Sequence, residues 1–110
     1  MDREVLRSMA LEALLADPTT EFRYLVNAVA RLAADRGIPG PEYTAGPDRT
    51  PLPGPTLSHS DMTILQEVVW DLIVDRVITP GADALNPQWP LLRMTERGMR
   101  KANEELGRSA

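Results

Sequence analysis

The sequence has no cysteine, a single histidine and few aromatic residues, namely one Phe, two Tyr and two Trp. The absence of cysteine excludes disulfides, thiolate nucleophiles and cysteine-ligated metals, and it favours a reducing, cytoplasmic location. The histidine, His59, lies in a Ser-His-Ser-Asp run whose spacing is explained by capping at the start of a helix. A catalytic triad or a metal site needs several groups that converge from different elements. We therefore predict a protein that is not an enzyme and that holds no metal or cofactor.

Long apolar runs and an excess of positive charge are also missing. No run approaches the roughly 20 apolar residues that cross a bilayer, and the first 15 residues lack the pattern of a secretion signal. We therefore expect a cytoplasmic protein with no membrane partner. Its 12 basic and 16 acidic residues give a net charge of −4, which supplies no overall attraction for nucleic acid. The length of 110 residues fits one domain, residues 1–110.

The spacing of apolar residues indicates a mainly helical chain. Apolar residues recur at helical intervals over residues 2–15, and again from Asp17, which we interpret as an N-cap before Pro18, to a stop at Gly37. The Ser58-x-x-Asp61 spacing predicts the start of a third helix, in which Trp70 is expected in the core. After a turn at residues 79–81, a short strand is predicted over 89–95, and Thr95 is expected to cap a last helix that ends at Gly107.

Residues 38–57 form the one stretch without such a pattern. They hold six prolines and three glycines, and proline supplies no backbone N–H for a helix or sheet. We therefore predict a long Pro/Gly-rich surface loop. It separates a helical pair (1–37) from a segment (58–110) made of a helix, a strand and a C-terminal helix.

Residues 64–98, ILQEVVWDLIVDRVITPGADALNPQWPLLRMTERG, resemble the latter part of a bacterial winged helix-turn-helix domain. The resemblance lies in the VWDLI helix, the VITPG exit into a strand, the N-P-x-W-P wing tip and the L-x-M-T-E-R-G return into a helix. It implies an α+β, mainly α fold, a winged helix with an N-terminal helical extension, the long Pro-rich loop and a small β-wing. It also implies a transcription-regulator-like module that binds double-stranded DNA.

Two sets of residues are expected at such a DNA interface. The resemblance implies base or backbone contacts from the third helix and the wing, through Ser60, Thr63, Gln66 and Gln88. Local charge indicates phosphate contacts near the C-terminus, because residues 93–110 hold five basic and three acidic residues. The predicted phosphate-binding residues are Arg93, Arg97, Arg100 and Lys101.

Two alternatives compete with this interpretation. Arg100 stands four residues from both Glu96 and Glu104, and Lys101 stands four residues from Glu105, so ordinary i,i+4 ion pairs on a solvated face would explain the charges equally well. The second alternative is a winged-helix protein-interaction adaptor that has lost DNA binding and uses Glu67, Asp71 and Trp89 with the Pro-rich loop.

The broad apolar face of the first helix must also be covered. Either it packs on the second helix, or it pairs with another subunit. Many winged-helix regulators dimerise in this way, so we expect a homodimer through helices 1 and 2.

Overall fold

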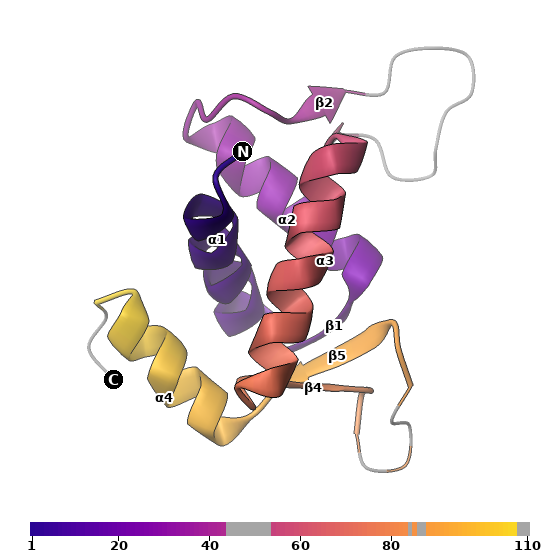
Figure 1. Cartoon of the computed structure of the whole chain (residues 1–110), viewed down its shortest axis with the longest axis vertical. Helices are drawn as coiled ribbons and strands as arrows, with labels where there is room; N and C mark the ends of the chain where they lie inside the picture. The colour runs from indigo at the N-terminus through magenta and orange to yellow at the C-terminus, as the bar shows by residue number, and fades with distance from the viewer. Residues whose placement is uncertain (44–53, 84, 86–87, 108–110) are drawn as a thin grey trace.

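The computed structural model describes residues 1–43, 54–83, 85 and 88–107. Within these residues the fold is α+β and mainly helical, with four helices, a three-stranded antiparallel sheet and a two-stranded ribbon (Figure 1). In chain order the elements are α1 (Arg3–Ala16), β1 (Thr19–Glu21), α2 (Phe22–Asp35), β2 (Glu42–Tyr43), β3 (Pro55–Thr56), α3 (His59–Val74), β4 (Ile78–Pro80), β5 (Leu91–Met94) and α4 (Glu96–Glu105).

The core lies between α1, α2, α3 and the inner face of the sheet. Helices α1 and α2 pack against each other, and α1 also packs on α3 and α4 (Figure 1). The buried face of α3 comprises Leu65, Val68, Val69 and Leu72, while β4 and β5 contribute Ile78, Leu92 and Met94. The strand β5 alternates between this core and the outer face, on which Arg93 is half-buried.

The sheet has the order β1-β5-β4, so strands from the two ends of the chain lie side by side. Thr19 pairs with Arg93 of the central strand, and Arg93 pairs in turn with Thr79 of β4. The predicted helix start at Asp17 is therefore wrong. Asp17 is the C-cap of α1, and pairing with β5 draws Thr19–Glu21 into a strand, so that α2 begins only at Phe22.

Two further expectations need correction. The turn predicted at residues 79–81 begins later, because Thr79 and Pro80 belong to β4. The Pro/Gly-rich stretch 38–57 is not wholly a loop either. Glu42 pairs with Thr56 in an antiparallel ribbon of β2 and β3, and β3 packs against α2. Residues 44–53 within that stretch, and Asn86-Pro87 of the predicted wing tip, lie outside the described residues.

The predicted caps of α3 and α4 are confirmed. Ser58 Oγ accepts a hydrogen bond from the backbone N–H of Asp61 (3.2 Å), and Thr95 Oγ1 accepts one from Gly98 (2.8 Å). Thr95 Oγ1 also donates to the carbonyl oxygen of Arg76 at 2.8 Å. This bond ties the start of α4 to the end of α3 and so fixes where the C-terminal cations lie.

Candidate functional site

The predicted contact residues of α3 lie on its exposed side. Ser60, Thr63 and Gln66 all come from the first half of the helix. The hydroxyl of Thr63 donates to the carbonyl oxygen of His59 at 3.0 Å, so it is partly occupied by its own helix. Gln88 is also exposed, in the loop between β4 and β5.

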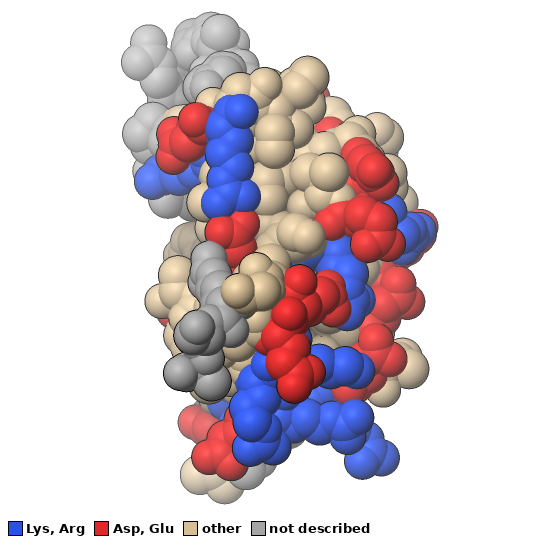
Figure 2. All heavy atoms as spheres, turned by 90° about the vertical axis from the view of Figure 1, so that its left-hand side faces the viewer, with Lys and Arg blue, Asp and Glu red and all other residues tan. Residues whose placement is uncertain are grey.

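The predicted phosphate-binding residues lie at the opposite end of α3. Arg97 and Arg100 are exposed on α4, and Lys101 is half-buried there. Figure 2, which views the molecule from the α4 side, shows Lys and Arg side chains gathered at the lower end of this face, below a group of Asp and Glu. Because α4 starts beside the last turn of α3, the structure does not bring these cations together with Ser60 and Thr63.

These cations form no close ion pair with an acid in the part of the chain that the structure describes, although Lys101 contributes to the lowered pKa of Glu105. Among the described residues, no ion pair within 4.0 Å involves Arg93, Arg97, Arg100 or Lys101. The i,i+4 pairs expected within α4 are therefore absent from that part of the chain. Glu105, the expected partner of Lys101, instead accepts two hydrogen bonds from Arg7 of α1, at 2.7 and 3.0 Å.

The structure adds two observations about cations near the start of α4. Arg76 was not predicted from the sequence, and the buried Nε atom of Arg93 was not expected. Arg76 is exposed in the connection from α3 to β4 and adopts a positive φ of 62°. No local pattern marks it, because its place beside α4 depends on the long-range Thr95 bond. The Nε atom of Arg93 is buried without a hydrogen-bond partner among the described residues, which leaves its donor capacity unused on the outer face of the sheet.

The acidic residues proposed for the adaptor interface face α1. Arg3 forms a hydrogen-bonded ion pair with Glu67 and lies 3.5 Å from Asp71. Both carboxylates remain more than half exposed, so Arg3 neutralises Glu67 and Asp71 only in part. Such exposed pairs contribute little to stability.

Trp70 is not in the core, contrary to expectation, because it projects from the side of α3 opposite to the buried leucines and valines. Its ring stacks on that of Trp89 with centroids 5.4 Å apart, and Trp89 in turn contacts Phe22 at the same distance. Trp70 is 45% exposed and Trp89 is 36% exposed. The aromatic contacts, one for Trp70 and two for Trp89, therefore cover only part of each indole.

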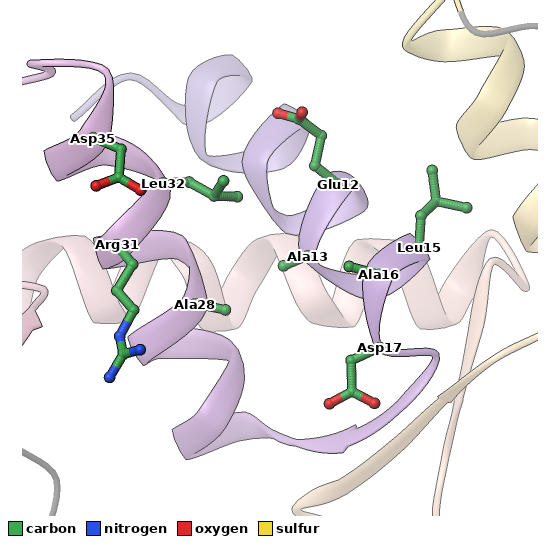
Figure 3. Close-up of a pocket in the computed structure, with 9 residues that line it drawn as sticks. All are labelled: Glu12, Ala13, Leu15, Ala16, Asp17, Ala28, Arg31, Leu32 and Asp35. Carbon is green, nitrogen blue, oxygen red and sulfur yellow. The ribbon is translucent and has the colours of Figure 1, made fainter.

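A surface groove of about 520 Å³ is lined by the second half of α1 and by residues of α2, which pack against each other beneath it. In Figure 3, Ala13 and Ala16 of α1 point toward Ala28 of α2, while the side chain of Arg31 points away from α1. Arg36 and Glu12 form a two-point ion pair between the two helices, at 2.6 and 2.8 Å.

The packing of α1 against α2 weakens the argument that led to the predicted homodimer. The apolar side chains of α1 and α2 pack within the chain itself, and Leu6, Met9, Leu11 and Leu14 are fully or almost fully buried. The apolar face that motivated dimerisation is thus already covered. A dimer through α1 and α2 would have to use their outer surfaces, and it stays a prediction.

Glu105 gives this region a pH dependence. The hydrogen bonds from Arg7 hold the pKa of Glu105 below its ordinary value of 4.5. A lowered pKa in the folded state stabilises the fold above the unfolded-state value, and this contribution is lost as the pH falls through the lowered value. We expect the urea concentration at the unfolding midpoint to decrease as the pH falls below about 4.5. Glu105→Gln should remove the part of this decrease that comes from protonation of Glu105. An unchanged pH profile in the variant would mean that the Arg7 contact does not stabilise the fold.

Other kinds of site find no support in the described residues. They contain no group of three or more His, Asp or Glu side chains placed to hold a metal ion. None of their helices combines the length and apolar character of a membrane span. A comparison with protein-family models, curated proteins and solved structures finds no match to this chain.

Proposed function

We propose that the chain is a winged-helix domain that binds double-stranded DNA through the cations around α4. The order of elements supports the architecture. A helix and a short strand precede a helix pair, α2 and α3, and a β-hairpin follows, with β1 pairing to the second hairpin strand. The hairpin of β4 and β5 corresponds to the wing, and α2 with α3 to the helix-turn-helix, interrupted by the Pro-rich stretch.

The observation that carries the binding proposal is the lack of acidic partners for Arg97, Arg100 and Lys101. Among the described residues no acid lies within 4.0 Å of these three cations, although Lys101 interacts electrostatically with Glu105, so the donors of Arg97 and Arg100 are the ones most available to a ligand. Phosphate binding follows the local potential more than the net charge of the protein. The three cations lie on one helix, Arg93 precedes the start of that helix in β5, and the Thr95 bond brings the backbone of Arg76 to the same start. The phosphate backbone of a duplex is the ligand that suits such a group of cations.

The net charge of −4 does not contradict this proposal, because α4 holds only three of the 16 acids, Glu96, Glu104 and Glu105, against its three cations. Glu67 and Asp71 belong to the middle of α3, and Glu12 and Asp35 to the α1–α2 side. A row of acids along α3 disfavours deep insertion of that helix into a groove. The proposal therefore assigns backbone contacts to α4 first, and leaves base contacts by Ser60, Thr63, Gln66 and Gln88 as predictions.

The test is the binding of a fluorescently labelled duplex of about 20 base pairs, measured by anisotropy over a series of salt concentrations. We expect affinity to fall steeply with salt. Arg97→Ala combined with Arg100→Ala should lower affinity at least tenfold and reduce the slope of log K against log[salt] by about 2, since each phosphate contact contributes about 1.

Arg36→Ala is the matched control, because this arginine is exposed but is held by Glu12 on the α1–α2 side. It should bind the duplex as the unaltered protein does. Absence of binding at low salt, or equal losses in the control and in the α4 variant, would overturn the proposal.

A further inference from the structure

An arginine with unused hydrogen-bond donors lies on the outer face of the three-stranded sheet. Arg93 of the central strand β5 is half-buried, and its Nε atom is buried without a hydrogen-bond partner among the described residues. Its two Nη atoms form no hydrogen bond with those residues either, but they are not buried and reach solvent. The base of the guanidinium is therefore held against the protein, while its tip is open to a ligand.

The other half-buried arginine in the described part of the chain is satisfied by an acid. Arg7 donates to both carboxylate oxygens of Glu105, at 2.7 and 3.0 Å. Arg93 has no acid within 4.0 Å among the described residues. A partly buried charged donor without an acceptor is unfavourable, because it has lost water and gained no partner. A ligand that supplies the missing acceptor would recover this free energy on binding.

The register of the sheet places a threonine on each side of Arg93. Thr19 of β1 and Thr79 of β4 lie directly opposite it, and opposed residues point to the same face with Cβ atoms about 5 Å apart. The backbone bond from Met94 to Pro18 makes the next pair a hydrogen-bonded one, so Thr19 and Arg93 form the other kind of pair, whose side chains are closer. Neither threonine hydroxyl has a hydrogen-bond partner in the described residues. We call Thr19, Arg93 and Thr79 the sheet row.

Two acids lie near the sheet row without pairing to Arg93. Glu21 is two residues beyond Thr19 in β1, and its carboxylate accepts a hydrogen bond from Arg23 at 2.8 Å. Asp17 is two residues before Thr19, and it has no cation within 4.0 Å among the described residues. Glu21 is therefore neutralised, whereas Asp17 would repel an anion bound at the sheet row. Removing the charge of Asp17 should strengthen anion binding.

The donors of the sheet row match the oxygen atoms of a phosphate group. A guanidinium binds phosphate through paired N–H donors, and threonine hydroxyls contact phosphates in the same complexes. We propose that the sheet row binds a phosphate group, which accepts hydrogen bonds from the Nη atoms of Arg93 and from the hydroxyls of Thr19 and Thr79. The source of this phosphate rests on the proposed function, since it belongs to the backbone of the duplex that α4 contacts. The inference adds β1 and β4 to the DNA interface.

Variants of the sheet row separate charge from hydrogen bonding in the duplex assay. Arg93→Gln should weaken binding about tenfold and reduce the slope of log K against log[salt] by about 1, because one charged phosphate contact is lost. Thr19→Val with Thr79→Val should weaken binding about fivefold without changing the slope, because hydroxyls carry no charge. Thr20→Val is the matched control, since Thr20 belongs to the same strand but opposes the buried Leu92. It should leave binding unchanged, and valine is a good strand former at all three positions.

Inorganic phosphate tests the sheet row without DNA. Its titration, followed by heteronuclear NMR, should shift the Nε–H resonance of Arg93 in a saturable manner, and Asp17→Asn should tighten this binding. A phosphate shift without duplex binding, or with duplex binding that the sheet-row variants leave unchanged, would support the site and assign it to free phosphate. The first of these results would also refute the proposed function.

Two results would overturn the inference. One is duplex binding that Arg93→Gln and the threonine variants leave unchanged, together with no phosphate shift, which would still leave the α4 contacts standing. The other is an equal shift with acetate, which would assign the sheet row to a carboxylate.

Discussion

Gly98→Ala is expected to destabilise the protein by more than about 3 kcal/mol, although alanine is the better helix former by about 1 kcal/mol. Gly98 is buried in the first turn of α4. A Cβ atom at this position would lie 1.9 Å from the carbonyl oxygen of Val77 and 2.7 Å from its carbonyl carbon. Both atoms belong to the backbone and cannot rotate away. Urea unfolding monitored by circular dichroism measures the loss.

The matched control is Gly37→Ala, at the end of α2. Gly37 has a φ of +67°, but a Cβ there meets no atom within 4 Å. Its substitution should cost only the roughly 1–2 kcal/mol of a left-handed backbone. If Gly98→Ala were no more destabilising than Gly37→Ala, then α4 would not be seated against Val77 as the structure has it. Because α4 carries Arg97 and Arg100, the same variant should also weaken duplex binding.

Local signals in the sequence were sufficient for α1, α3 and α4 and for the end of α2. Periodic apolar residues and the caps at Ser58 and Thr95 depend on neighbours within one turn, so they can be recognised without knowing the rest of the fold. The strand β1 could not be found in this way. Asp17-Pro18 has the local chemistry of a helix start, and only the pairing of Thr19–Glu21 with a strand some 70 residues later overrides it.

In the candidate sites too, some features follow from the local sequence and others depend on contacts between distant parts of the chain. The cations of α4 were predicted from local charge, but the lack of a close ion pair between Lys101 and Glu105 depends on Arg7 of α1, which donates two hydrogen bonds to Glu105. The prediction that Trp70 lies in the core was wrong. Its size and apolarity favour burial, and the local sequence does not say whether another element covers that side of α3. Periodicity does place Trp70 and Val74 opposite Leu65 and Leu72. An apolar residue on the polar side of an otherwise well-patterned helix is therefore the sequence signal for the exposure of Trp70 and Val74.

The second large effect is expected at Asp61, which is only 4% exposed in the first turn of α3. Its carboxylate accepts a hydrogen bond from the N-terminal ammonium of Met1 at 2.8 Å, and both groups are almost fully buried. Asp61→Asn removes the negative charge and leaves the ammonium buried without its counter-ion. Breaking one side of such a pair costs about 3–5 kcal/mol, which unfolding in urea would detect.

A double-mutant cycle separates this pair from other roles of Asp61. A single glycine added before Met1 displaces the ammonium and should destabilise the protein on its own, yet have almost no further effect in the Asp61→Asn background. Glu67→Gln, on the same helix, removes an exposed carboxylate that pairs with Arg3, and should change stability far less. Additive losses from the extension and from Asp61→Asn would refute the pairing. Strong coupling would mean that this buried contact holds Met1 against α3, the helix that carries Trp70.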